Sequence, residues 1–144
     1  MNFAAFYQEI RERLIVLRRS RIGARFVLSC KPDQIKEWAM GRLSTHVLDT
    51  ALGKPAAGVK IRLYRVSGNS HEKIAEVVTN SDGRTDGPLL SGDMLKPGTY
   101  ELVFLAGDYL RASGQAVGDV LFLNEIPIRF GVPDADQHYH VPLL

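Results

Sequence analysis

The sequence predicts an all-β fold, an antiparallel β-sandwich with one short helix, over residues 41–144. Two observations support this prediction. Short segments of alternating apolar and polar residues follow one another from Leu43 onwards, and clusters of Gly, Pro, Asn and Asp separate them. Residues 1–40 differ, because their apolar residues recur at helical spacing. We therefore expect a helical N-terminal extension over 1–40, followed by the sandwich.

The N-terminal segment is predicted to contain an amphipathic helix over residues 3–19. Its apolar residues recur every three or four positions: Phe3, Phe6, Ile10, Leu14 and Leu17. Gly23 is expected to end this helix, and residues 31–33 to begin a second one. The apolar run at residues 14–17 is shorter than a secretory signal requires. No run in the chain approaches the ~18 apolar residues that span a membrane, so we expect a cytoplasmic protein without a membrane partner.

Composition and charge restrict the function further. The 144 residues are 45% hydrophobic and 24% charged, which is typical of a soluble globular domain with its own core. The net charge is +2, but residues 1–39 hold eight Lys or Arg against four Asp or Glu, and residues 40–144 hold ten against twelve. The sandwich is therefore not basic, which argues against nucleic acid as a partner. The single cysteine, Cys30, cannot form an internal disulfide.

Six strands and one short helix are predicted within the sandwich. The strands are expected over residues 43–49, 59–64, 73–79, 99–104, 126–130 and 137–143, and the helix over 108–113. The second and third strands are predicted to form a hairpin, because Ser67-Gly68-Asn69-Ser70 is a turn signal between them. Pro127 cannot donate a ladder hydrogen bond, so its strand is expected at a sheet edge.

Three histidines are predicted to lie on the outer faces of the first and last strands. Residues 43, 45 and 47 are apolar or β-branched and share one face of the first strand, so His46 lies on the other. In the last strand, His138 and His140 lie opposite the apolar residues 139, 141 and 143. If these strands pair, His46 and His140 are cross-strand neighbours with Cβ atoms about 5 Å apart.

Two imidazoles at that separation have a chemical use. Each raises the cost of protonating the other, so at least one stays neutral near pH 7 and can act as a base toward water. The alternative interpretation is that these histidines are only exposed to solvent on a wet sheet face.

Arg84 is a further candidate, because it follows the turn signal Asn80-Ser81-Asp82-Gly83. A guanidinium projecting from a turn suits the carbonyl or oxyanion groups of a small polar substrate. The alternative is a surface arginine paired with Asp82 or Asp86. No Cys, His or Asp spacing forms a recognisable metal motif, so we expect no metal.

Five motifs in order resemble one enzyme family. They are Ser44-Thr45-His46-Val47-Leu48-Asp49, Gly53-Lys54-Pro55-Ala56, Thr79-Asn80-Ser81-Asp82-Gly83-Arg84, Pro97-Gly98-Thr99-Tyr100 and His138-Tyr139-His140-Val141-Pro142-Leu143-Leu144. Over residues 42–144 the chain resembles the 5-hydroxyisourate hydrolases, the transthyretin-related enzymes of urate breakdown. The hormone carrier transthyretin lacks these histidines, so the chain is more similar to the hydrolase branch.

The resemblance implies a transthyretin-like sandwich that assembles as a homotetramer, with active sites at the interface between dimers. It implies hydrolytic opening of a ring amide in 5-hydroxyisourate without a cofactor. His46 and His140 are implied as catalytic residues that activate water and shuttle protons. Arg84 is implied as a substrate-binding residue, and His138, on the same face as His140, is included with it.

One departure from the family lies at the end of the chain. The family continues past Val-Pro-Leu-Leu through another strand and ends in Tyr-Arg-Gly-Ser, whereas this chain stops at Leu144. We therefore expect a C-terminally incomplete sandwich. An alternative function is a non-catalytic, prealbumin-like β-sandwich that binds a partner. A weaker alternative is attachment to a membrane or nucleic acid through the basic N-terminal helix.

Overall fold

The computed structural model describes residues 40–116 and 118–144. The helices predicted within residues 1–39 lie outside the described residues. Within the described ranges, most of the regular structure consists of strands that form two main sheets, with one short α-helix. The prediction of an all-β fold with a single short helix is confirmed.

The two main sheets contain three and four strands. The smaller has the order β6-β1-β9, with bounds Leu90–Ser91, Arg42–Ser44 and His138–His140. The larger has the order β5-β4-β7-β8, with bounds Ser70–Val78, Lys60–Ser67, Gly98–Phe104 and Ile126–Val132. The remaining described elements are the ladder of β2 (Leu48–Asp49) with β3 (Lys54–Pro55), the 3₁₀ turn η1 (Gly92–Met94) and the helix α3 (Ala106–Ala112).

The larger sheet is antiparallel throughout and follows the sequence closely. β4 and β5 form the predicted hairpin, with Ser67 paired to Ser70 and a register shift between Leu63 and Tyr64. β8, which contains Pro127, lies at the edge of this sheet, as predicted. The edge position suits proline because one side of an edge strand needs no ladder donor.

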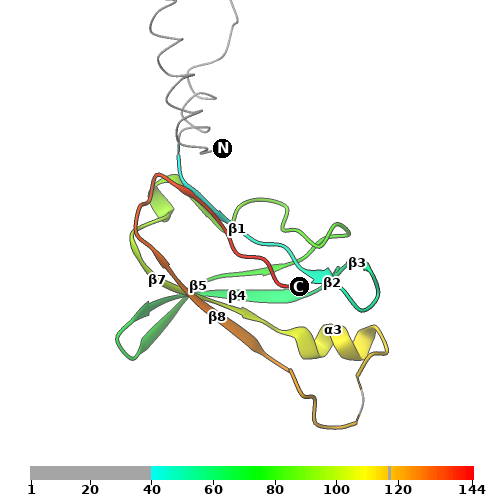
Figure 1. The fold of residues 1–144 in the computed structure, drawn as a ribbon. Helices are drawn as coiled ribbons and strands as arrows, with labels where there is room; N and C mark the ends of the chain where they lie inside the picture. Colours follow the sequence, from blue (N-terminus) through cyan, green and yellow to red (C-terminus); the bar gives the residue numbers. More distant parts are fainter. Residues whose placement is uncertain (1–39, 117) are drawn as a thin grey trace, which may run out of the picture. The chain divides into compact units, whose positions relative to one another are not determined.

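The smaller sheet brings together the first and last strands of the sandwich. β1 pairs with β6 in antiparallel and with β9 in parallel orientation, and Figure 1 shows β1 and the C-terminal segment running side by side. Parallel neighbours need a long crossover connection, and here the larger sheet and α3 lie within it. The register places Ser44 opposite His140 and Leu43 opposite Tyr139.

Both strands of this pair are shorter than predicted. The stretch 43–49 divides into β1 and β2, because the pairing partners change between them: His46 forms an isolated bridge with Arg84, and Val47 forms one with Leu143. β9 ends at His140. Pro142 has no backbone N–H to continue a regular ladder.

The core is built from alternate residues of strands in both sheets. The largest fully buried side chains include Leu43 from β1, Ile61 and Leu63 from β4, and Tyr100, Leu102 and Phe104 from β7. The Tyr100 hydroxyl is satisfied because it donates to the Lys96 carbonyl at 2.8 Å. This inward packing leaves the intervening residues of each strand on the outer faces.

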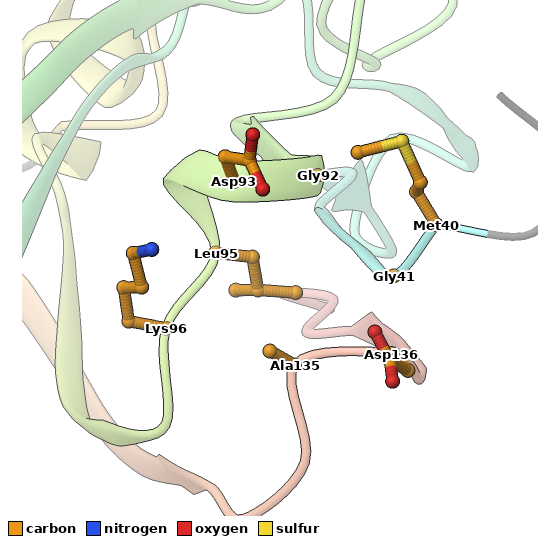
Figure 2. Close-up of a pocket in the computed structure, with 8 residues that line it drawn as sticks. All are labelled: Met40, Gly41, Gly92, Asp93, Leu95, Lys96, Ala135 and Asp136. Atoms are coloured by element: carbon orange, nitrogen blue, oxygen red, sulfur yellow. The ribbon is translucent and has the colours of Figure 1, made fainter. Parts of the chain in front are cut away.

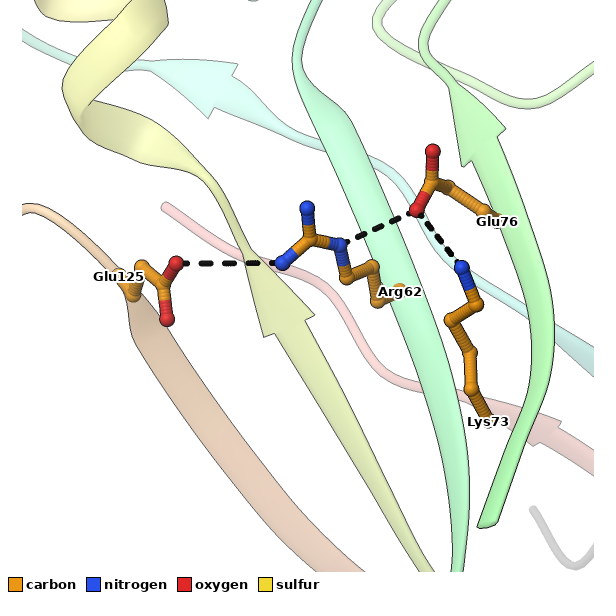
Figure 3. Close-up of polar contacts among 4 residues, drawn as sticks. All are labelled: Arg62, Lys73, Glu76 and Glu125. Atoms are coloured by element: carbon orange, nitrogen blue, oxygen red, sulfur yellow. Dashed lines mark hydrogen bonds and ion pairs between the residues drawn. The ribbon is translucent and has the colours of Figure 1, made fainter. Parts of the chain in front are cut away.

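The outer face of the larger sheet is covered by exposed ion pairs. Figure 3 shows Arg62 between Glu76 and Glu125, at 3.1 and 4.0 Å, with Lys73 at 3.3 Å from Glu76. Pairs this exposed contribute little to stability, roughly 0–1 kcal/mol each. The stability of the domain therefore depends mainly on the apolar core.

We expect Leu102→Ala to destabilise the domain by about 2–5 kcal/mol, because it leaves a cavity in the packed core. Leu102 is 0% exposed in β7. The matched control is Val78→Ala in β5, where the side chain is 53% exposed and the change should stay within about 0.5 kcal/mol. Urea denaturation of both variants measures the difference. Equal midpoints would contradict this account of the core.

Candidate active site

His46 and His140 contact each other through their ring edges. His46 Nδ1 lies 2.6 Å from His140 Nε2. The ring planes are within 19° of parallel and the centroids are 4.7 Å apart. Because the nitrogens are much closer together than the centroids, the contact is an N–H···N hydrogen bond between ring edges. The sequence-based prediction that these two histidines are neighbours is confirmed.

The register explains how the two rings meet. The direct partner of His140 on the neighbouring strand is Ser44, and His46 lies two residues further along. Alternation places Ser44 and His46 on the same outer face, while Leu43, Thr45 and Val47 are buried on the other. His46 therefore reaches His140 diagonally, and not as the directly opposite residue that the sequence suggested.

The electrostatic surroundings favour a neutral His46. Partial burial, the neighbouring His140 and the nearby Arg84 guanidinium lower the pKa of His46 below its ordinary value. The hydrogen bond also requires one ring to present a lone pair to the other ring's N–H. Since Nδ1 of His46 is engaged with His140, Nε2 is the nitrogen that remains to accept a proton.

Ser44 completes a chain of three side chains. Its hydroxyl oxygen lies 2.9 Å from His140 Nδ1, so each nitrogen of the His140 ring has a protein partner. Ser44 was not among the predicted site residues. The available signal was its position two residues before His46, which puts both side chains on the outer face of one extended segment.

Arg84 is held beside His46 by the turn that precedes it. His46 and Arg84 form an antiparallel bridge, and Val47 N–H donates to the Gly83 carbonyl at 2.8 Å. Asn80 closes the turn, because its side-chain oxygen accepts from the backbone N–H groups of Asp82 and Arg84. The turn therefore fixes the backbone from which Arg84 projects.

The alternative role for Arg84, pairing with Asp82 or Asp86, has no support among the contacts of the described residues. Asp86 accepts a hydrogen bond from Asn80 at 3.1 Å. Ion pairs within 4.0 Å among residues 40–116 and 118–144 involve other side chains. The exposed Arg84 guanidinium is thus available to an oxygen-rich ligand.

His138 occupies the same outer face but a different rung. It pairs with Arg42 across β1 and β9. Burial first, and Arg42 second, lower the pKa of His138. Of the two histidines of β9, the hydrogen bond to His46 is made by His140. The structure thus brings His46, His140 and Arg84 together. His138 lies beside them on the same face of β9, two residues before His140.

The site lies on the outer surface of the smaller sheet, outside two pockets of the described residues. The pocket in Figure 2 has a volume of about 150 Å³. Its lining residues are Met40, Gly41, Gly92, Asp93, Leu95, Lys96, Ala135 and Asp136. A second, of about 210 Å³, lies between α3 and residues 47–51. Neither is lined by His46, His140 or Arg84. In the part of the chain that the structure describes, no cluster of His, Cys, Asp or Glu is arranged to hold a metal ion.

Comparison with known proteins identifies several similar chains. A family model described as the HIUase/Transthyretin family matches residues 43–144. The chain is 62% identical over 104 residues to 5-hydroxyisourate hydrolase 2 of Rhizobium meliloti (strain 1021), which covers 72% of this chain and 87% of that protein. The family match includes every residue of the site described above.

Two solved structures are similar to this one. A crystal structure of (S)-allantoin synthase has a TM-score of 0.68 and 43% identity, covering 72% of this chain and 39% of that chain. The 5-hydroxyisourate hydrolase of Klebsiella pneumoniae has a TM-score of 0.57 and 31% identity, covering 71% of this chain and 81% of that chain.

We expect His46 to titrate with a midpoint below the value of about 6.5 that an unperturbed histidine shows. Burial and two cationic or titratable neighbours disfavour its imidazolium form, so the ring stays neutral to lower pH. NMR titration of its Cε1–H signal measures this. Arg84→Ala should raise the midpoint, because it removes a positive charge, whereas Arg84→Lys should leave it low. A His46 midpoint at or above 6.5 in the parent protein would refute the conclusion that its surroundings favour the neutral ring.

We also expect Gly83→Ala to separate Arg84 from His46. A Cβ at Gly83 would lie 2.3 Å from the Val47 carbonyl oxygen, and its φ of +69° is left-handed. The matched control is Gly53→Ala, where φ is +63° but nothing lies within 4 Å. Both changes cost about 1–2 kcal/mol of backbone strain, but only Gly83→Ala should shift the His46 midpoint. The idea fails if both variants behave alike in NMR and thermal melting.

Proposed function

Because the chain belongs to the HIUase/Transthyretin family, we propose that it is a hydrolase that opens a ring amide bond of 5-hydroxyisourate in urate breakdown. The single observation that supports this most directly is the His46–His140 hydrogen bond beside Arg84. It combines a neutral base with a permanent cation on one exposed surface. Those are the two groups that attack of water on an amide carbonyl requires.

His46 is proposed as the general base. Its Nε2 accepts a proton from water as the water oxygen attacks the ring carbonyl. The carbon–nitrogen bond of the ring then breaks, and the departing nitrogen takes a proton from the histidine pair. The reaction consumes one water and returns the pair to its starting state. General base catalysis of this kind contributes typically about 10²- to 10⁴-fold.

Arg84 is proposed to bind the substrate and stabilise the charge that develops on the carbonyl oxygen. A guanidinium presents several N–H donors in one plane, which suits the oxygens of a small heterocycle. His138 is proposed as a further substrate contact, because it lies on the same outer face as His140. These roles use water, a base and a cation, so the mechanism assigns no cofactor.

We further propose that the active protein is a homotetramer with its sites at the interface between dimers. The site is an exposed sheet surface outside the two pockets described above. A second surface placed over it would enclose a small substrate together with the attacking water and keep bulk solvent out. In the described residues, no helix is both long and apolar enough to cross a membrane. The cytoplasmic location and the absence of nucleic-acid and membrane partners stay predictions.

The decisive measurement is the decay of freshly generated 5-hydroxyisourate in the presence of the full chain. His46→Ala and His140→Ala should each lower kcat/KM by about 10²-fold or more, and Arg84→Ala by a similar factor with loss of substrate affinity. His71→Ala is the matched control, because His71 is an exposed histidine of the larger sheet.

Two outcomes would contradict the proposal. Decay in the parent protein that is no faster than in buffer would remove the hydrolase activity. Equal rates for the parent and all three site variants would place the chemistry elsewhere. A non-catalytic binding module predicts the first outcome, together with partner binding that the site substitutions leave unchanged.

A further inference from the structure

We propose that Ser44 is a positioning residue that sets the tautomer of His140 and, through it, the protonation of the base nitrogen of His46. The inference deepens the proposed function and rests on it. It starts from two contacts of the Ser44 hydroxyl oxygen, which lies 2.9 Å from His140 Nδ1 and 3.4 Å from the Tyr139 carbonyl oxygen. One oxygen is thus within reach of both a ring nitrogen and a backbone acceptor.

The backbone holds this contact in place. Ser44 and His140 are direct partners in the parallel ladder of β1 and β9. The N–H of Val141 donates to the Ser44 carbonyl at 3.0 Å, and the N–H of Leu143 donates to the His46 carbonyl at 2.9 Å. On the other side of the contact, the N–H of Arg42 donates to the Gln137 carbonyl at 3.2 Å. Because both strands are fixed on either side, the backbone holds the hydroxyl and the ring side by side.

The direction of the Ser44 hydroxyl decides the state of the whole chain. When its O–H donates to the Tyr139 carbonyl, its lone pair accepts from His140 Nδ1–H. His140 Nε2 then accepts from His46 Nδ1–H, and His46 Nε2 carries a lone pair. When the O–H donates to His140 Nδ1 instead, every bond reverses, and His46 Nε2 carries a hydrogen. Only the first arrangement makes His46 a base toward water.

The first arrangement also accommodates the proton that the reaction releases. His46 Nε2 gains a proton from water, and His46 Nδ1 can pass its own proton to His140 Nε2. His140 then carries the positive charge with both N–H groups partnered, one by His46 and one by the Ser44 oxygen. The reverse transfer returns the proton to His46 Nδ1, and His46 then gives its Nε2 proton to the departing ring nitrogen. Protons are conserved at each step, and Ser44 accepts throughout.

The neighbouring hydroxyl shows what a purely structural residue looks like. Thr45 follows β1 directly and is buried, and its Oγ1 donates to the Val141 carbonyl at 2.7 Å on the core side. It touches neither histidine through that bond. Thr45→Val keeps the shape and removes the hydroxyl, so it reports the effect of losing a hydroxyl that only supports the fold.

The test compares Ser44→Ala, Ser44→Thr and Thr45→Val in the full chain. ¹⁵N NMR of the histidine side chains, without substrate, identifies which nitrogen of His140 bears hydrogen. We expect the Nδ1–H form in the parent and in Ser44→Thr, and a shift toward the Nε2–H form in Ser44→Ala. Thr45→Val should keep the parent tautomer, whatever it does to the melting temperature.

The kinetic readout follows the same pattern. Ser44→Ala should lower kcat on 5-hydroxyisourate by about 10- to 100-fold, by analogy with the loss on removing partners that orient metal-bound histidines. KM should stay within about twofold, because Ser44 is not assigned a substrate contact, and the acid limb of the pH profile should move. Ser44→Thr should keep kcat near the parent value, because threonine retains the hydroxyl.

The two proposals fail in distinguishable ways. A parent protein that does not hydrolyse 5-hydroxyisourate removes the function, while the ¹⁵N spectra still decide whether Ser44 sets the His140 tautomer. An unchanged tautomer in Ser44→Ala overturns the inference whatever the activity. So does a changed tautomer with unchanged kcat and pH profile in an active parent, or a kcat loss that Ser44→Thr does not restore.

Discussion

The parallel pairing of β1 with β9 is the constraint on which the site depends. Successive side chains of a strand point to opposite faces, so a slip of one residue would send the whole outer set of a strand into the core. Leu43 is fully buried opposite Tyr139, which packs against the same core. Because the core requires these two residues inside, Ser44 and His140 must lie outside. The apolar core thus determines where the histidines lie.

A second set of backbone contacts, separate from the β1–β9 pairing, positions Arg84. The Asn80–Gly83 turn packs its backbone against Val47, immediately after His46. A glycine is needed there for two reasons, since the φ is left-handed and a Cβ would collide with a carbonyl oxygen. Three segments that are distant in sequence therefore meet around His46, and each is held by backbone contacts.

The charges of the site act together on one ring. His46 is partly buried and lies near two groups that can be positive, so its neutral form is favoured. A base must be neutral at the working pH to accept a proton, and the cation that favours this state is also the group proposed to bind substrate oxygens. In the larger sheet, by contrast, Arg129 and His71 lie against the carboxylate of Glu101. That carboxylate offsets the positive charge of Arg129, so an anionic ligand would be attracted there less strongly than at Arg84.

The sequence by itself determined the local features of this protein. Alternation placed residues 43, 45 and 47 inward and His46 outward, turn signals located the β4–β5 hairpin, and Pro127 marked an edge strand. Alternation and a turn signal also made His140 and Arg84 candidates, and motif resemblance gave them roles. Only the tertiary structure decided that Ser44 is the direct partner of His140 and that His46 reaches His140 diagonally, through a ring-to-ring hydrogen bond. The physical reason is that register between strands so far apart in the chain depends on the packing of the whole core, and no short stretch of sequence contains that information.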